Sequence, residues 1–249
     1  MKKILISLIM LTALYSCSCS SKKPKEKTYT IARDPSWEKI SLLGREDHLK
    51  GFVDDVLRII SKEEGVTINL VATSRSQIHN ALKNGELDAI VSNKRVLKSR
   101  EDYYNFSDPF FFVGPVLIVT SDSTVKGFED LYDKTIGLLT GSDAILYVEK
   151  HPSIRIKTYY NILVGINSLI NKDIDAVVMG LVPAHAYTEN IYRGKLKVVS
   201  DSLTDNSLRL LTLKTDGKNE LIDLFNRNIN KIQEDGRYDM LLRKWGLYQ

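Results

Sequence analysis

One pattern of residues occurs twice in the chain, and it restricts the possible folds more than any other feature. Residues 84–92 read Asn-Gly-Glu-Leu-Asp-Ala-Ile-Val-Ser, and residues 171–179 read Asn-Lys-Asp-Ile-Asp-Ala-Val-Val-Met. Each copy has the end of a helical pattern, an acidic turn, and then Asp-Ala followed by apolar residues typical of a buried strand. One α/β unit used twice predicts two lobes of similar build.

The first copy closes a series of β-rich and helical stretches. Strands are expected at residues 28–33, 67–73 and 88–93. Apolar residues at helical spacing predict a helix around residues 52–60 that ends at Gly65, and a shorter helix over 76–84 that ends at Gly85. This β-α-β-α-β order indicates a largely parallel sheet covered by helices.

The second copy closes a similar series. Its strands are expected at 136–140, 155–159 and 175–179, and its helices at 142–150 and 162–171. Two long β-rich runs, 110–120 and 208–213, are expected to cross between the lobes, and the chain ends in helices at 220–234 and 237–245. Two lobes joined by two strands form a hinged clamp. We therefore expect a first lobe of residues 28–118 and 207–249, and a second lobe of residues 119–206.

The distribution of charge argues against nucleic-acid binding. The formal net charge is +4, from 35 basic and 31 acidic residues. Residues 1–27 contain six of the lysines and one glutamate, so the remaining chain has 29 basic and 30 acidic residues. The basic excess therefore belongs to the N-terminus, and the body has no electrostatic basis for binding phosphates.

The N-terminus has the pattern of an export signal. Lys2 and Lys3 precede a short apolar run over residues 4–14, which is typical of a secretory signal of residues 1–16. The next residues, Leu14-Tyr15-Ser16-Cys17, look like the lipobox of a bacterial lipoprotein, which implies acylation of Cys17. Residues 17–27 then form a lipidated tether to the membrane. An ordinary signal peptide with an incidental cysteine is the alternative. Cys19 has no assigned role, and the body has no cysteine for a disulfide.

Several short strings, in order and at the expected spacing, carry a resemblance to a known family. They are Gly51-Phe52-Val53-Asp54-Asp55, Leu82-Lys83-Asn84-Gly85-Glu86-Leu87-Asp88-Ala89, Arg100, Phe106-Ser107-Asp108-Pro109-Phe110, Gly137, Gly141-Ser142, Asp175-Ala176, Gly236-Arg237-Tyr238 and Lys244-Trp245-Gly246. With them the chain resembles the bacterial extracytoplasmic solute-binding proteins, family 3, of polar-amino-acid ABC transporters, in lipoprotein form. The resemblance implies the α/β clamp of type II periplasmic binding proteins, with a mostly parallel sheet and flanking helices in each lobe.

The resemblance also implies a ligand site in the first lobe. Arg100 falls where the family places an arginine that grips the α-carboxylate of the ligand, a task that suits a planar guanidinium. Ser92 and Asn93 correspond to positions that hydrogen-bond the main-chain atoms of the ligand, although a plain turn is the alternative. Asp34 falls where an acid reads a cationic side chain, and Trp37 where an aromatic ring stacks on it. Asp34 before a proline also suits a turn.

In the second lobe, Thr140, Ser142 and Asp143 follow a strand, and the family uses this helix start as a second clamp on the carboxylate. Helix capping by Ser142 or Asp143 explains the same residue types. Three positions depart from the family. Arg95 and Asp143 stand where small hydroxyl residues are common, and Gly180 replaces the usual acid that pairs with the α-ammonium of the ligand.

The expected function is capture of a small solute, an amino acid or related zwitterion, and its delivery to an ABC permease. We expect a monomeric binding protein outside the cytoplasm, anchored by lipid, without catalytic residues, cofactor or metal. The four histidines show no metal spacing, and no phosphate loop or nucleophile motif is present. Two alternatives stay open. One is a periplasmic dehydratase or lyase on the same fold, similar to cyclohexadienyl dehydratase. The other is a surface interaction protein that has lost amino-acid binding.

Overall fold

The computed structural model describes residues 26–35, 42, 44–142, 144–214 and 219–247. The first half of the chain contains β1 (Thr28–Arg33), α1 (Glu46–Glu64), β2 (Thr67–Ala72), α2 (Ile78–Lys83), β3 (Ala89–Ser92), α3 (Lys98–Glu101), β4 (Tyr104–Phe106), β5 (Phe111–Phe112) and β6 (Pro115–Thr120). The second half contains the 3-10 helix η2 (Phe128–Leu131), β7 (Thr135–Leu139), α4 (Ile145–Val148), β8 (Arg155–Tyr159), α5 (Ile162–Ile170), β9 (Ala176–Gly180), α6 (Leu181–Ala186), the π-helical turn η3 (Tyr187–Ile191), β10 (Leu196–Val198), β11 (Ser207–Leu213), α7 (Glu220–Glu234) and α8 (Arg237–Trp245).

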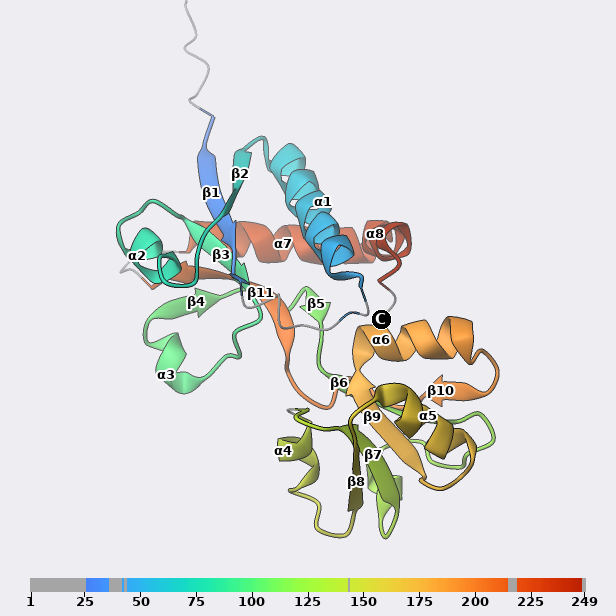
Figure 1. The fold of residues 1–249 in the computed structure, drawn as a ribbon. Helices are drawn as coiled ribbons and strands as arrows, with labels where there is room; N and C mark the ends of the chain where they lie inside the picture. The colour runs from blue at the N-terminus through green and yellow to red at the C-terminus, as the bar shows by residue number, and fades with distance from the viewer. Residues whose placement is uncertain (1–25, 36–41, 43, 143, 215–218, 248–249) are drawn as a thin grey trace, which may run out of the picture.

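The strands form two sheets with equivalent strand orders. The first sheet has the order β2-β1-β3-β11-β4, with β5 paired to β11, and the second has the order β8-β7-β9-β6-β10. In both sheets the first three strands are parallel and the fourth is antiparallel to them. Figure 1 shows the first sheet and its helices above the second, with chain segments near β5, β6 and β11 running between them. The structure therefore confirms one α/β unit used twice.

The repeated Asp-Ala sequence has the same structural role in both sheets. The backbone amide of Asp88 donates to the carbonyl of Thr30 at 2.9 Å, and its carboxylate accepts from the amide of Thr30 at 2.7 Å. Asp175 makes the same two bonds with Thr135, both at 2.8 Å. Each aspartate thus satisfies a backbone amide of the neighbouring parallel strand, that of Thr30 within β1 and that of Thr135 at the start of β7. The repeated Asp-Ala sequence therefore helps to pair two parallel strands in each sheet.

The expectation of mostly parallel sheets is wrong in one respect. Each sheet is mixed: β11, β4 and β5 pair antiparallel in the first sheet, and β6 and β10 do so in the second. The expected continuous run over residues 110–120 is also divided. Phe111–Phe112 pairs with β11 in the first sheet, whereas Pro115–Thr120 pairs with β9 and β10 in the second. The expected lobe boundary after residue 118 therefore falls inside β6, and the pairing favours a division ahead of Pro115.

Other expected elements differ in length or were not expected. The helix expected at residues 142–150 is limited to Ile145–Val148. The short elements α3, β4, α6 and β10 were not expected from the sequence. They are too short for hydrophobic periodicity to reveal them. The long helices agree closely, and Gly65 ends α1 in the left-handed conformation with φ 62°, as a C-terminal glycine does.

The two connections between the sheets lie side by side. The amides of Val113 and Gly114 donate to the carbonyl of Asn206 at 2.9 and 3.1 Å. The approach is close enough to require glycine: a Cβ on Gly114 would lie 2.0 Å from the hydroxyl oxygen of Ser202 and 2.9 Å from the carbonyl oxygen of Thr204. Only glycine therefore fits at position 114 while the two connections stay this close.

Both faces of each sheet are covered. Along the strands of the first sheet, neighbouring residues alternate between a cluster under α1, α7 and α8 and a smaller cluster under α2. Phe52 of α1 is fully buried and packs edge-on against Tyr238 of α8, with ring centroids 5.5 Å apart. The hydroxyl of Tyr238 donates to the carbonyl of Phe110 at 2.5 Å. The C-terminal helices thus pack on the first sheet.

Asp55 and Gly51 explain two of the short sequence strings. A Cβ on Gly51 would lie 2.2 Å from the indole of Trp245, so only glycine lets α8 approach α1 this closely. The carboxylate of Asp55, in a residue that is 6% exposed, accepts hydrogen bonds from the indole of Trp245 at 3.0 Å, from Lys244 at 2.5 Å and from Arg58. Burial favours the neutral acid, but these three donors outweigh it and lower the pKa of Asp55.

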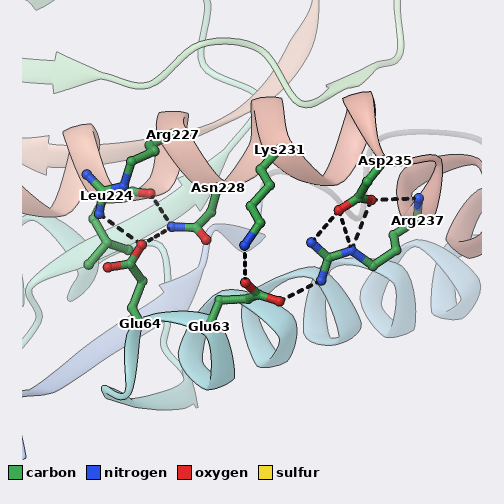
Figure 2. Close-up of polar contacts among 8 residues, drawn as sticks. All are labelled: Glu63, Glu64, Leu224, Arg227, Asn228, Lys231, Asp235 and Arg237. Carbon is green, nitrogen blue, oxygen red and sulfur yellow. Dashed lines mark hydrogen bonds and ion pairs between the residues drawn. The ribbon is translucent and has the colours of Figure 1, made fainter.

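A second polar network joins the end of α1 to α7 and α8, and Figure 2 shows its members. Glu63 accepts from Lys231 and, at 2.9 Å, from Arg237. Glu64 accepts from Arg227 at 2.8 Å and from the buried amide of Asn228 at 2.6 Å. Most of these groups are partly solvated, and exposed ion pairs contribute little stability. The network therefore fixes the orientation of α7 more than it stabilises the fold.

We expect the Asp55→Asn substitution to lower the free energy of unfolding by about 1–3 kcal/mol at pH 7, because the buried carboxylate loses its charge-assisted hydrogen bonds. The pKa of Asp55 is lower in the folded chain than its ordinary value of 3.8. The unfolded chain therefore takes up the proton first as the pH falls. The difference between the variant and the original chain should be full at pH 7 and shrink as the pH falls through 3.8 and below. Urea denaturation at several pH values measures it.

The matched control is Asp47→Asn in the same helix, where an exposed carboxylate pairs with Lys50 on the surface. This variant should unfold almost as the original chain does. An Asp55→Asn variant as stable as the original chain at pH 7, or a difference that does not change with pH, would contradict the role given to Asp55.

Candidate functional site

The carboxyl ends of β1 and β3 lie side by side, and three side chains meet there. Asp34 directly follows β1 and is 2% exposed, and its amide donates to the carbonyl of Val91 at 2.9 Å. Its carboxylate accepts from the hydroxyl of Ser92 at 2.7 Å and from the ammonium of Lys94 at 2.5 Å. Ser92 is fully buried, and its hydroxyl also accepts from the amide of Lys94 at 3.2 Å. The structure thus brings together two of the expected site residues and adds Lys94.

Lys94 was not selected from the sequence. It follows the expected strand, at a place where basic residues are common on protein surfaces. The only feature of the sequence that could have indicated a role in the site was its spacing of two residues from Ser92. Residues 92 and 94 are two apart, so in an extended segment both side chains point to the same side. Recognising the pair with Asp34 also required knowing that β1 and β3 are neighbours in parallel register.

Arg100 lies on α3, beyond the end of β3, and is half-buried. Its guanidinium donates to the backbone carbonyl of Arg95 at 3.0 Å, and the side chain of Arg95 is exposed. The side chain of Tyr104, on β4 directly after α3, is affected by two of the charges of this region. Burial raises the pKa of Tyr104, while the charge of Arg100 lowers it and the charge of Asp34 raises it further. Asp34, Ser92 and the half-buried Asn93 therefore lie at one edge of the first sheet, and Arg95 and Arg100 belong to the segment that continues from β3.

The expected residues of the second lobe gather at the matching edge of the second sheet. Strands β7 and β9 are parallel, and Leu138 lies opposite Val178, so Thr140 and Gly180 follow at the same level. Leu139 lies opposite Tyr159, which places Tyr160 at this edge, and Tyr160 is 95% exposed. Open α/β sheets bind ligands outside the carboxyl ends of their strands. Both sheets thus present their expected site residues at the edge where such sites form.

The anion site expected at a helix start is weaker than the sequence suggested. Helix α4 has four residues and begins at Ile145, so its dipole is small. The hydroxyl of Ser142 accepts from the amide of Ala144 at 3.3 Å in the turn ahead of the helix. The N-cap of α4 is Ala144 and has no side-chain cap hydrogen bond, so capping by Ser142, the expected alternative, is wrong. Thr140 is exposed. Gly180 lies at the end of β9 and provides no side chain that could pair with an ammonium.

Three expected residues lie outside the described part of the chain: Trp37, Asp143 and the lipidation site Cys17. Among the described residues, two surface hollows lie away from the two edges. One is lined by Tyr29, Asp88 and Glu220 at the amino end of the first sheet, and the other lies beside α1 and β2. Neither hollow contains an expected site residue.

Within the described ranges, no group of three or more His, Cys, Asp or Glu side chains is arranged to hold a metal ion. No helix in these ranges has the length and hydrophobicity needed to cross a membrane.

Comparison with known proteins identifies the family. The family of bacterial extracellular solute-binding proteins, family 3, matches residues 29–248. The chain therefore belongs to this family. Its two sheets, with equivalent strand orders and two connections, form the α/β fold of the type II periplasmic binding proteins.

Individual relatives are distant but similar over almost their whole length. A probable histidine-binding protein of Neisseria gonorrhoeae is 24% identical over 224 residues, which cover 88% of this chain and 83% of that protein. An arginine-binding periplasmic protein of Mannheimia haemolytica is 26% identical, with 95% and 97% covered. The ABC transporter glutamine-binding protein GlnH of Bacillus subtilis is 25% identical, with 98% and 97% covered.

Solved structures show the same fold. The unliganded, open L-cystine solute receptor of Neisseria gonorrhoeae superposes with a TM-score of 0.67 at 18% identity, covering 89% of this chain and 93% of that chain. The second substrate binding domain of a putative amino acid ABC transporter from Streptococcus pneumoniae gives a TM-score of 0.65 at 22% identity, covering 88% and 100%. At these identities the likeness extends to the fold and not to the ligand.

Proposed function

We propose that this protein captures an amino acid between its two lobes and delivers it to an ABC permease. The observation that carries the proposal is the pair of matching carboxyl edges, one on each sheet, where the expected ligand residues gather. On the first edge lie Asp34, Ser92, Asn93, Arg95 and Arg100, and on the second lie Thr140, Ser142 and Gly180. A ligand that contacts both edges stabilises the closed arrangement relative to the open one.

The connections between the sheets suit such a movement. Two short segments, near Gly114 and Asn206, join the sheets and are hydrogen-bonded to each other. Hinge closure in clamps of this kind needs only a few residues that change their backbone angles. We propose that the two lobes are the moving units. Trp37 and Asp143 are proposed to complete the ligand site on the first and second lobe.

The relatives support an amino acid as the ligand and a binding role without catalysis. Their names describe binding proteins for histidine, arginine and glutamine, and GlnH is named as a component of an ABC transporter. We therefore propose that the chain is not an enzyme and acts as a monomer. A dehydratase would turn over its ligand, and a surface protein without a solute would bind none, so the binding experiment below separates these alternatives.

We also propose that the protein is anchored outside the cytoplasm through Cys17. The sequence at residues 14–17 suits acylation after removal of residues 1–16, and residues 17–27 would link the lipid to the body. A multiply acylated anchor holds a protein at the membrane, whereas one chain binds only reversibly. Such an anchor would keep the receptor close to its permease.

Thermal unfolding in the presence of L-amino acids tests the binding role. A ligand at about 100 times its Kd should stabilise the protein by about 2.7 kcal/mol and raise its Tm. We expect Arg100→Gln to weaken binding by about 10- to 100-fold, because charge-assisted hydrogen bonds to the carboxylate are lost. The matched control is Arg243→Gln, at an exposed arginine of α8, which should retain the full shift. If no amino acid raises the Tm, or if Arg100→Gln binds as tightly as the original chain, the proposed site is wrong.

Labelling of the bacterium that makes the protein with an alkyne fatty acid tests the anchor. The original chain should incorporate the label and sediment with membranes, and Cys17→Ala should lose both properties. Cys19→Ala is the matched control, since it removes the only other cysteine and should keep both. Label that remains in Cys17→Ala would show that the anchor is not at this residue.

A further inference from the structure

We propose that Lys94 makes this site select an amino acid with an anionic side chain and exclude one with a cationic side chain. The inference rests on the proposed function and names its ligand class. It departs from the expectation that Asp34 reads a cationic side chain, and from the ligands named for the arginine- and histidine-binding relatives.

The first step is that Asp34 already has a cation. Its carboxylate lies 2.5 Å from the ammonium of Lys94 and 2.7 Å from the hydroxyl of Ser92. Asp34 is 2% exposed and Ser92 is fully buried. A buried carboxylate needs such partners to remain ionised. The Lys94 ammonium therefore occupies the position beside Asp34 that the ammonium or guanidinium of a basic ligand would take.

The second step is that Lys94 remains accessible. The side chain of Lys94 is 32% exposed, whereas that of Asp34 is 2% exposed. An ammonium has three N–H donors, so Lys94 can hold Asp34 and still meet a second anion from the solvent side. A ligand that approaches this edge encounters the N–H groups of the lysine before the aspartate, and the two side chains together carry no net charge.

The third step is the balance of charge at the two edges. The exposed Arg95 follows Lys94 in the chain, and the half-buried Arg100 lies on α3 together with the exposed Glu101. At the edge of the second sheet, Gly180 ends β9 and Thr140 to Ser142 carry no charge, so the sequence supplies one acid there, Asp143. Because Lys94 and Asp34 cancel each other, the net positive charge of this edge comes from Arg95 and Arg100. One of them can pair with the α-carboxylate of a ligand, and the other, with the accessible N–H groups of Lys94, favours a second carboxylate. A ligand side chain with a positive charge meets cations of like sign.

The test is isothermal titration calorimetry of the full-length protein in detergent with L-glutamate, L-glutamine and L-arginine. Glutamate and glutamine have nearly the same shape and differ in charge, so their ratio isolates the electrostatic contribution. We expect glutamate to bind at least about tenfold more tightly than glutamine, and arginine to bind most weakly. We expect Lys94→Met to abolish the preference for glutamate and to strengthen arginine binding by about tenfold or more, because Asp34 then lacks its internal cation.

Two further variants control this experiment. Lys94→Arg keeps the charge and should keep the preference for glutamate, which separates the effect of charge from any loss of folding in Lys94→Met. Lys134→Met removes another lysine paired with an aspartate, Asp175, at the amino end of the second sheet, and should leave all three affinities unchanged.

The outcomes distinguish this inference from the function on which it rests. If arginine binds the original chain as tightly as glutamate, or if Lys94→Met keeps the original ratio of affinities, the role of Lys94 is overturned while the binding function stands. If none of a full panel of amino acids binds, the proposed function fails, and the inference fails with it.

Discussion

The close approach of the two connections at Gly114 is the constraint on which the arrangement of the two sheets depends. The carbonyl of Asn206 accepts from two successive amides of the other connection, and Gly114 leaves no room for a side chain between them. The carbonyl of Gly114 also accepts from the amide of Leu181 at the start of α6. Because both connections are short and bonded together, a change in the relative position of the sheets must be absorbed by backbone rotations in these few residues.

The two sheets bring equivalent strand ends to this hinge. In each, two parallel strands flank a central strand, and an aspartate ahead of one flanking strand bonds a threonine of the central strand through the same pair of hydrogen bonds. These aspartates therefore have a structural role, and the carboxyl end of each sheet is the end where a ligand can bind. The positions that depart from the family, Arg95, Asp143 and Gly180, all follow strands at the carboxyl ends, as does Lys94. We infer that the fold is common to the family and that the ligand preference is set at these ends.

The fold could be predicted from the sequence to a large extent, because its long elements have strong periodicity. Helix α1 shows apolar residues at helical spacing and a terminal glycine, and the Asp-Ala repeat marked both α/β units. The division of residues 110–120 between two sheets could not be predicted, because both halves are apolar and only their pairing partners differ. The candidate site was predictable only as positions after strands. The pairing of Asp34 with Lys94 joins two strand ends that are 60 residues apart in the chain. A pattern of neighbouring residues therefore could not predict this pairing.

Closure of the two lobes on a ligand is the central claim, and an interlobe distance tests it most directly. The body has no native cysteine, so spin labels can be placed at Ser99→Cys on α3 and Glu149→Cys after α4, both exposed positions. Pulsed electron resonance on the Cys17→Ala, Cys19→Ala background then reports the distance between the labels. With L-glutamate at saturation we expect a single shorter distance than in the ligand-free protein. An unchanged distance at a glutamate concentration that saturates binding would contradict the clamp.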